Sequence, residues 1–135
     1  MKRKEGREID YIVIVGFNIL RFDIPILIQK GVEYGVDTHA KLNQLWYSVH
    51  TIDYLQTSLP FHDMKFRGLK LEYLAKKAKE KNIDIPEPFE SGEKVIEWYE
   101  KGEYSKIINH LRTDLMITRV IDLNYKRIYD LEPRE

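Results

Sequence analysis

The chain has 135 residues, a length typical of a single domain, and its 43% hydrophobic and 33% charged residues indicate a globular rather than a disordered protein. Lys plus Arg and Asp plus Glu number 22 each, so a net charge of zero excludes a strongly basic nucleic-acid-binding arm but not a local basic groove. The absence of cysteine excludes disulfides, zinc sites with thiolate ligands and cysteine nucleophiles.

The start of the chain carries no targeting signal that we recognise. Residues 1–10 are mostly charged, and no apolar stretch typical of a signal peptide follows them. The longest apolar run, Tyr11–Phe17, is too short to span a bilayer. We therefore expect an intracellular, cytoplasmic protein that does not insert into a membrane.

Two segments have strand-like patterns. Tyr11–Val15 is a β-branched run closed by Gly16, which predicts a strand buried on both faces, as in a parallel sheet. Tyr47–Leu55 also has β propensity and ends before Leu59 and Pro60. Two strands make a small sheet with uncovered edges, so we expect another element or another chain to cover them.

Helical signals fill most of the remaining sequence. Asp23 with Pro25 predicts the start of a helix that ends at Gly31 or Gly35. Further helices are expected at residues 68–81, at 95–99 after a Ser91 cap, and at 104–129, with a connector at 82–88. These elements predict one α/β domain over residues 1–135, with a small, mainly parallel sheet flanked by helices.

The last helix has apolar residues at every third or fourth position. This periodicity predicts a core-facing stripe. Its members are Ile107, Ile108, Leu111, Leu115, Val120, Ile121 and Tyr125.

The first candidate site is the segment Asn18–Asp23, which directly follows the first strand. Open α/β sheets bind ligands at the carboxyl ends of their strands, so Asp23 is well placed to hold a divalent cation. The alternative is that Asp23 only caps the helix and Asn18 only completes the turn.

The second candidate site is Asn109–Asp114 on the last helix. His110 and Asp114 are one turn apart and share a face. Leu111 and Leu115 lie on the neighbouring apolar stripe, so the carboxylate needs a positive partner, which could be a metal ion, an arginine or a lysine. The alternative is a surface His–Asp pair.

Both sites resemble motifs of one family. Val15–Leu27 resembles the second exonuclease motif of the proofreading 3′–5′ exonuclease domain of family B DNA polymerases, in which an Asn follows the strand and an aromatic–Asp pair comes several residues later. Asn109–Arg119 is similar to the third motif, where a helix carries a Tyr or His upstream of a metal-binding Asp. The Leu71–Ala75 helix also suits the family. The resemblance covers about Ile9–Tyr129 and is closest to archaeal proteins related to this polymerase domain.

This resemblance implies a ribonuclease H-like fold that hydrolyses single-stranded DNA at its 3′ end. In the family, four carboxylates hold two Mg²⁺ or Mn²⁺ ions about 4 Å apart. The resemblance assigns Asp23 and Asp114 to metal binding, and His110 to orienting or deprotonating the attacking water. It also implies that Asn18 and Phe22 position the terminal nucleotide.

Arginines beside the two motifs are candidates for contacts with nucleic acid. Arg112 lies within the second motif, and Arg21 lies within the first. Arg21 and Arg67 could form a strip for single strands with nearby aromatic residues. These aromatic residues are Trp46, Tyr54 and Phe66, and the alternative is that most of them belong to the core.

The first motif of the family, an Asp-x-Glu on the first strand, has no counterpart near the N-terminus. The only Asp-x-Glu is Asp130–Glu132. We therefore expect an incomplete site that holds at most one metal ion weakly and a poor nuclease. A non-catalytic single-strand-binding module and a truncated product without an independent role are the alternatives. The missing strands would leave a sheet edge exposed, so we expect a homo-oligomer or a partner segment to cover it.

Overall fold

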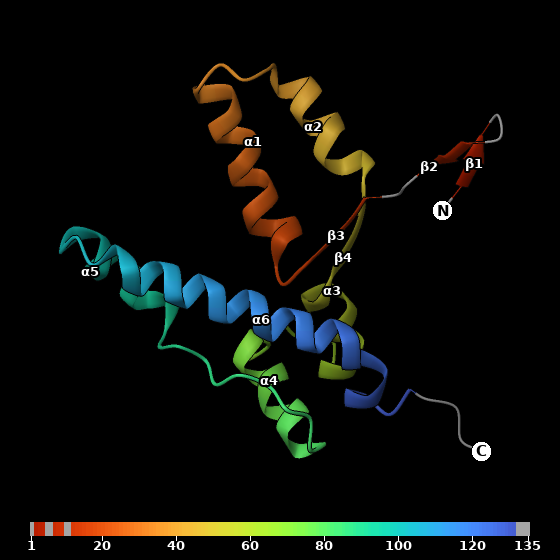
Figure 1. Ribbon diagram of the computed structural model, residues 1–135, viewed down its shortest axis with the longest axis vertical. Helices are drawn as coiled ribbons and strands as arrows, with labels where there is room; N and C mark the ends of the chain where they lie inside the picture. Colours follow the sequence, from red (N-terminus) through yellow and green to blue (C-terminus); the bar gives the residue numbers. More distant parts are fainter. Residues whose placement is uncertain (1, 5–6, 10–11, 132–135) are drawn as a thin grey trace. The chain divides into compact units, whose positions relative to one another are not determined.

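The computed structural model describes residues 2–4, 7–9 and 12–131 (Figure 1). The chain divides into two compact units, residues 1–57 and residues 58–135. None of the described helices combines the length and the apolar character needed to cross a membrane.

The first unit contains two pairs of strands. β1 (Lys2–Lys4) and β2 (Arg7–Ile9) form an antiparallel pair, which the sequence analysis did not predict. β3 (Val13–Gly16) and β4 (His50–Asp53) form a parallel pair, in a register that places Gly16 opposite Asp53. The expectation of an α/β protein with a parallel sheet is confirmed at this level.

Three helical segments connect and follow the parallel strands. A π-helical turn, η1 (Ile19–Asp23), runs directly into α1 (Ile24–Glu33), and α2 (His39–Ser48) precedes β4. α3 (Tyr54–Ser58) follows β4 without a loop. The prediction of a helix after Asp23 is confirmed, and its end lies before Gly35, which takes a left-handed φ of 68°.

Two expectations for the strands are wrong. The segment Tyr47–Leu55 contains only a four-residue strand, because its first residues end α2 and its last residues begin α3. The strand at β3 is not buried on both faces: Ile12 is 71% exposed and Val13 is 45% exposed, while Tyr11 lies outside the described residues. A pair of short strands offers too few neighbours to cover both faces.

The core of the first unit lies between α1 and α2. Ile24 and Ile28 of α1 pack with Leu42 of α2, and the partly buried Leu20 and Trp46 lie against them. α2 begins at Thr38, whose hydroxyl accepts a hydrogen bond from the backbone N–H of Lys41. α2 was not predicted from the sequence.

The second unit is helical. A 3₁₀ turn, η2 (Leu59–His62), leads to α4 (Leu71–Glu80), and an irregular connector leads to η3 (Gly92–Lys94) and α5 (Val95–Glu100). The 25-residue helix α6 (Tyr104–Ile128) packs against α4 and α5. Helices were expected at α4, α5 and α6 but not at η2, and the Ser91 cap is confirmed by its hydrogen bond from the Glu93 backbone N–H.

The buried face of α6 agrees with the predicted stripe at Ile121 but differs from it elsewhere. Leu74, Ala75 and Ala78 of α4 are buried, as are Ile117 and Ile121 of α6. In contrast, three residues of the predicted stripe are more than half exposed, and they are Ile108, Leu111 and Leu115. α4 has 10 residues and α5 has 6, so these two partners cover only part of the surface of a 25-residue helix.

Candidate functional site

The first candidate site begins where β3 ends. Asn18 has a left-handed backbone, with φ 61° and ψ 24°, and the π-helical turn Ile19–Asp23 follows it. π-helical turns are rare and are often found at functional sites. The chain approaches itself closely here, because a Cβ atom at Gly16 would clash with the side chain of Ile19. A glycine is therefore required for this turn to leave the strand.

Asp53, at the end of β4, holds this turn in place. Its Oδ1 accepts hydrogen bonds from the backbone N–H groups of Asn18 at 2.8 Å and Leu55 at 3.0 Å, and its Oδ2 accepts one from Leu20 at 3.0 Å. The residue is only 3% exposed. A buried carboxylate is tolerated when donors satisfy it, so Asp53 is a positioning residue that links both parallel strands to the turn.

Asp23 occupies the last position of the turn, at the N-terminal end of α1. Its side chain makes no capping hydrogen bond to the helix, so the interpretation of Asp23 as only a cap is wrong. Partial burial raises the pKa of the Asp23 carboxyl, and the negative charge of Asp53 raises it further. A positive charge bound near Asp23 would relieve this repulsion.

The Asn18 side chain supplies a second oxygen at this turn. Its Oδ1 is buried, and no group in the described part of the chain donates a hydrogen bond to it. The amide oxygen of Asn18 and the carboxylate of Asp23 are both hard oxygen ligands of the kind that Mg²⁺ prefers. Within residues 2–4, 7–9 and 12–131, no group of three His, Cys, Asp or Glu is arranged to hold a metal ion. Of these two donors, the exposed Asp23 carboxylate is the one open to a hydrated cation, because the Asn18 Oδ1 is buried.

Two predicted nucleic-acid-binding residues belong to the same turn. Phe22, directly before Asp23, is 59% exposed, and Arg21 beside it is also exposed. An exposed aromatic ring next to a cation is a suitable surface for stacking a base and contacting a phosphate.

The second candidate site lies in the second unit. His110 Nε2 lies 3.2 Å from Oδ2 of Asp114, one turn along α6, and His110 Nδ1 lies 2.8 Å from the carbonyl oxygen of Phe89. The imidazole also makes an edge contact with the ring of Trp98, with 6.1 Å between ring centroids. The predicted pairing of His110 with Asp114 is present.

The partners of His110 constrain its protonation. Because a carbonyl oxygen can only accept a hydrogen bond, Nδ1 is the donor toward Phe89. The contact between Nε2 and Asp114 then needs one proton, which either group can supply. Both ring nitrogens are engaged, so this arrangement suits His110 to positioning the Asp114 carboxylate rather than to accepting a proton from water.

The carboxyl group of Asp114 has a raised pKa. Partial burial raises the pKa of its carboxyl above the ordinary 3.8, His110 opposes this change, and the negative charge of Glu72 adds to it. The folded state therefore binds this proton more tightly than the unfolded state does. The stability that results is present at low pH and is lost as the pH rises through the raised pKa.

This predicts a specific effect of Asp114→Asn on pH dependence. In the wild type, the stability of the second unit should decline as the pH rises from 3.8 through the raised pKa of Asp114. This decline should be absent in the variant. The difference should be less than about 1 kcal/mol, because solvent screens a partly exposed carboxylate. Urea unfolding at several pH values tests this, with the exposed Asp84→Asn as the control. An unchanged pH profile in Asp114→Asn would contradict the assignment.

Comparison with known proteins finds no relative. No protein-family model matches the chain, and no curated protein and no solved structure is significantly similar to it.

The predicted site residues fall into two groups. The first unit contains Asn18, Arg21, Phe22 and Asp23 within one turn. The second unit contains His110, Arg112 and Asp114 on α6, where Arg112 is exposed.

Three further acidic residues bear on the candidate sites. Asp130 of the only Asp-x-Glu forms an ion pair with Lys81 at 2.7 Å, and Glu132 lies outside the described residues. Asp53 was not predicted as a site residue, although its place at the end of the second parallel strand is a signal that the sequence contains.

Proposed function

We propose that this protein binds single-stranded nucleic acid through a ribonuclease H-like arrangement and acts on 3′ ends as a metal-dependent exonuclease of low efficiency. The observation that supports this most directly is the Asp23 carboxylate. It ends the turn that follows the carboxyl end of β3, and it is not used as a helix cap. Partial burial raises its pKa, and the charge of Asp53 raises it further. Ligands of α/β sheets bind at this end of the strands.

Each residue of the turn has its own role in binding. Asp23 would hold one divalent cation, which would neutralise charge on the scissile phosphate, and Asn18 would position the terminal nucleotide. Phe22 packs against the terminal base or sugar, and Arg21 contacts a phosphate. Asp53 fixes the backbone of the turn through its three hydrogen bonds.

The resemblance to exonucleases also assigns metal binding to Asp114. His110, whose two ring nitrogens are engaged, holds that carboxylate in one orientation. Each carboxylate is tested separately, because each lies in its own unit.

A non-catalytic single-strand-binding module is the second candidate. The exposed Phe22 ring favours it, because stacking of bases on aromatic side chains needs no metal ion. In this case affinity should fall steeply with salt and should not change when EDTA replaces Mg²⁺.

The deciding experiment is a time course with a 3′-labelled single-stranded DNA oligonucleotide in Mg²⁺, Mn²⁺ or EDTA. We expect slow hydrolysis by the wild type in Mn²⁺ and at least about a 100-fold loss in Asp23→Asn, because a metal ligand is removed. Asp114→Asn should also lose activity. Asp37→Asn is the control, since this exposed carboxylate in the loop before α2 is remote in sequence from both motifs.

Gel-shift measurements in EDTA separate binding from hydrolysis. Asp23→Asn should retain binding or bind more tightly, because a negative charge that repels phosphate is removed. Binding without hydrolysis in either metal would favour the non-catalytic module. Hydrolysis that survives Asp23→Asn, or the absence of both binding and hydrolysis in the wild type, would contradict the proposal.

A further inference from the structure

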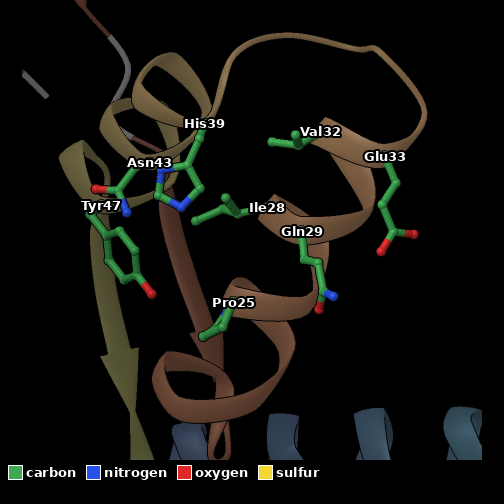
Figure 2. Close-up of a pocket in the computed structure, with 8 residues that line it drawn as sticks. All are labelled: Pro25, Ile28, Gln29, Val32, Glu33, His39, Asn43 and Tyr47. Carbon is green, nitrogen blue, oxygen red and sulfur yellow. The ribbon is translucent and has the colours of Figure 1, made fainter.

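A pocket lies along the α1–α2 pair of the first unit, separate from the turn that carries Asp23. Its volume is about 350 Å³, which is within the usual range for pockets that bind small molecules. Figure 2 shows Ile28 and Pro25 of α1 projecting toward the side from which His39 and Tyr47 of α2 project. The lining residues are Pro25, Ile28, Gln29, Val32, Glu33, His39, Asn43 and Tyr47.

The two helices contribute different chemistry to the pocket. α1 supplies three apolar residues, Pro25, Ile28 and Val32, together with the polar Gln29 and Glu33. α2 supplies His39, Asn43 and Tyr47, which are spaced four residues apart and therefore share one helix face. This combination offers two flat rings and, between them along the helix, an amide with two donors and one acceptor.

The charges of the pocket do not favour an anionic ligand. Its lining contains Glu33 and no Lys or Arg, and Lys30 of α1 is already paired with Glu33 at 2.8 Å. A phosphate would therefore find no unpaired lysine or arginine in the lining. A flat, neutral heteroaromatic ring with a hydrogen-bonding edge satisfies the apolar residues, the rings and the amide together.

The position of the pocket connects it to the candidate site. Pro25 lies two residues after Asp23, so the pocket begins at the end of α1 that carries the site and extends along the helix to Glu33. The eight helical steps from Pro25 to Glu33 span about 12 Å. We propose that this pocket binds a nucleobase of the single strand whose 3′ end lies at Asp23, with Asn43 reading the edge of the base. This inference rests on the proposed function.

Oligonucleotides with one abasic position test the inference. In the wild type, removing the base that enters the pocket should weaken binding roughly tenfold, whereas most other positions should have smaller effects. Asn43→Leu should weaken binding of the intact strand and reduce this abasic effect to less than about twofold. Gln44→Leu, the same kind of substitution at the next residue of α2, is the control and should behave as the wild type does. Both positions are exposed, so both variants should fold.

The outcomes separate this inference from the proposed function. If the strand binds and the abasic effect is equal in Asn43→Leu and Gln44→Leu, the pocket assignment is overturned while the proposed function stands. If the wild type does not bind the strand, both fail. A titration with free nucleosides, followed through the amide signals of α1 and α2, covers the other source of a base. Saturable binding of a nucleoside without an abasic effect would replace the strand with a free nucleoside and would overturn the inference as stated.

Discussion

Asp53→Ala should lower the free energy of unfolding of the first unit by about 4 kcal/mol. The substitution leaves three backbone N–H groups, those of Asn18, Leu20 and Leu55, without their acceptor. Each buried donor that loses its partner costs about 1–3 kcal/mol, and partial access of water reduces the sum. The effect is large because one side chain satisfies the turn after β3 and the start of α3 at the same time.

Urea unfolding followed by circular dichroism measures this change, and hydrogen exchange localises it. Protection of the Asn18 and Leu20 amides should fall more than protection of amides in α6. The control is Asp37→Ala, which removes an exposed carboxylate that accepts one local hydrogen bond from the Thr38 N–H. Its effect should stay below about 1 kcal/mol. A loss of less than about 1 kcal/mol in Asp53→Ala would show that the turn does not depend on this carboxylate.

The same variant connects stability to function. Asp53→Ala stays mostly folded only where the free energy of unfolding of the wild type exceeds the loss that the substitution causes. Asp53→Asn keeps one acceptor oxygen and should lose less stability than Asp53→Ala. If the turn positions Asp23, metal-dependent hydrolysis should fall in Asp53→Asn under conditions where the protein remains folded, because the buried Asp53 carboxylate holds the backbone of the turn.

Ile117→Ala should destabilise the second unit by about 3 kcal/mol, whereas Leu115→Ala should change its stability by less than about 0.5 kcal/mol. Ile117 is fully buried, and Leu115 is 59% exposed two residues earlier on the same helix. Truncating the buried side chain leaves a cavity that its neighbours fill only in part. Truncating the exposed one removes a surface contact with solvent.

This pair of variants distinguishes the observed core face of α6 from the one expected from periodicity alone. Both substitutions introduce alanine, the best helix former, into the same helix. A difference in helix propensity therefore cannot explain a large difference between the two variants. Urea unfolding of the two variants under identical conditions gives the comparison. Equal losses would mean that Leu115 is also covered in solution, and a larger loss in Leu115→Ala would reverse the assignment of the faces.

Much of the secondary structure could be predicted because its signals are local. The β-branched run before Gly16 predicted β3, and Asp23 with Pro25 predicted the start of α1. α2 was missed because its apolar residues do not form a strong stripe: in the described structure, Leu42 is its only fully buried residue. The β propensity from Val49 onward then extended the predicted strand into the helices on both sides.

In each candidate site, the proximity of the residues could be predicted from the sequence. The pairing of His110 with Asp114 could be predicted, because residues one helical turn apart meet wherever the helix forms. The sequence could also place Asn18, Phe22 and Asp23 in one turn after a strand. Their spacing along the chain is short enough to determine their proximity.

The sequence by itself determined these local arrangements, since short-range geometry depends on backbone periodicity and turn chemistry. The tertiary structure alone decided the role of Asp53, which bonds to Asn18 across 35 residues of sequence because the parallel register places it opposite Gly16. It also decided which face of α6 is buried, because burial depends on the length and placement of α4 and α5. Apolar periodicity marks the residues that can be buried, and the packing partners select which of them are.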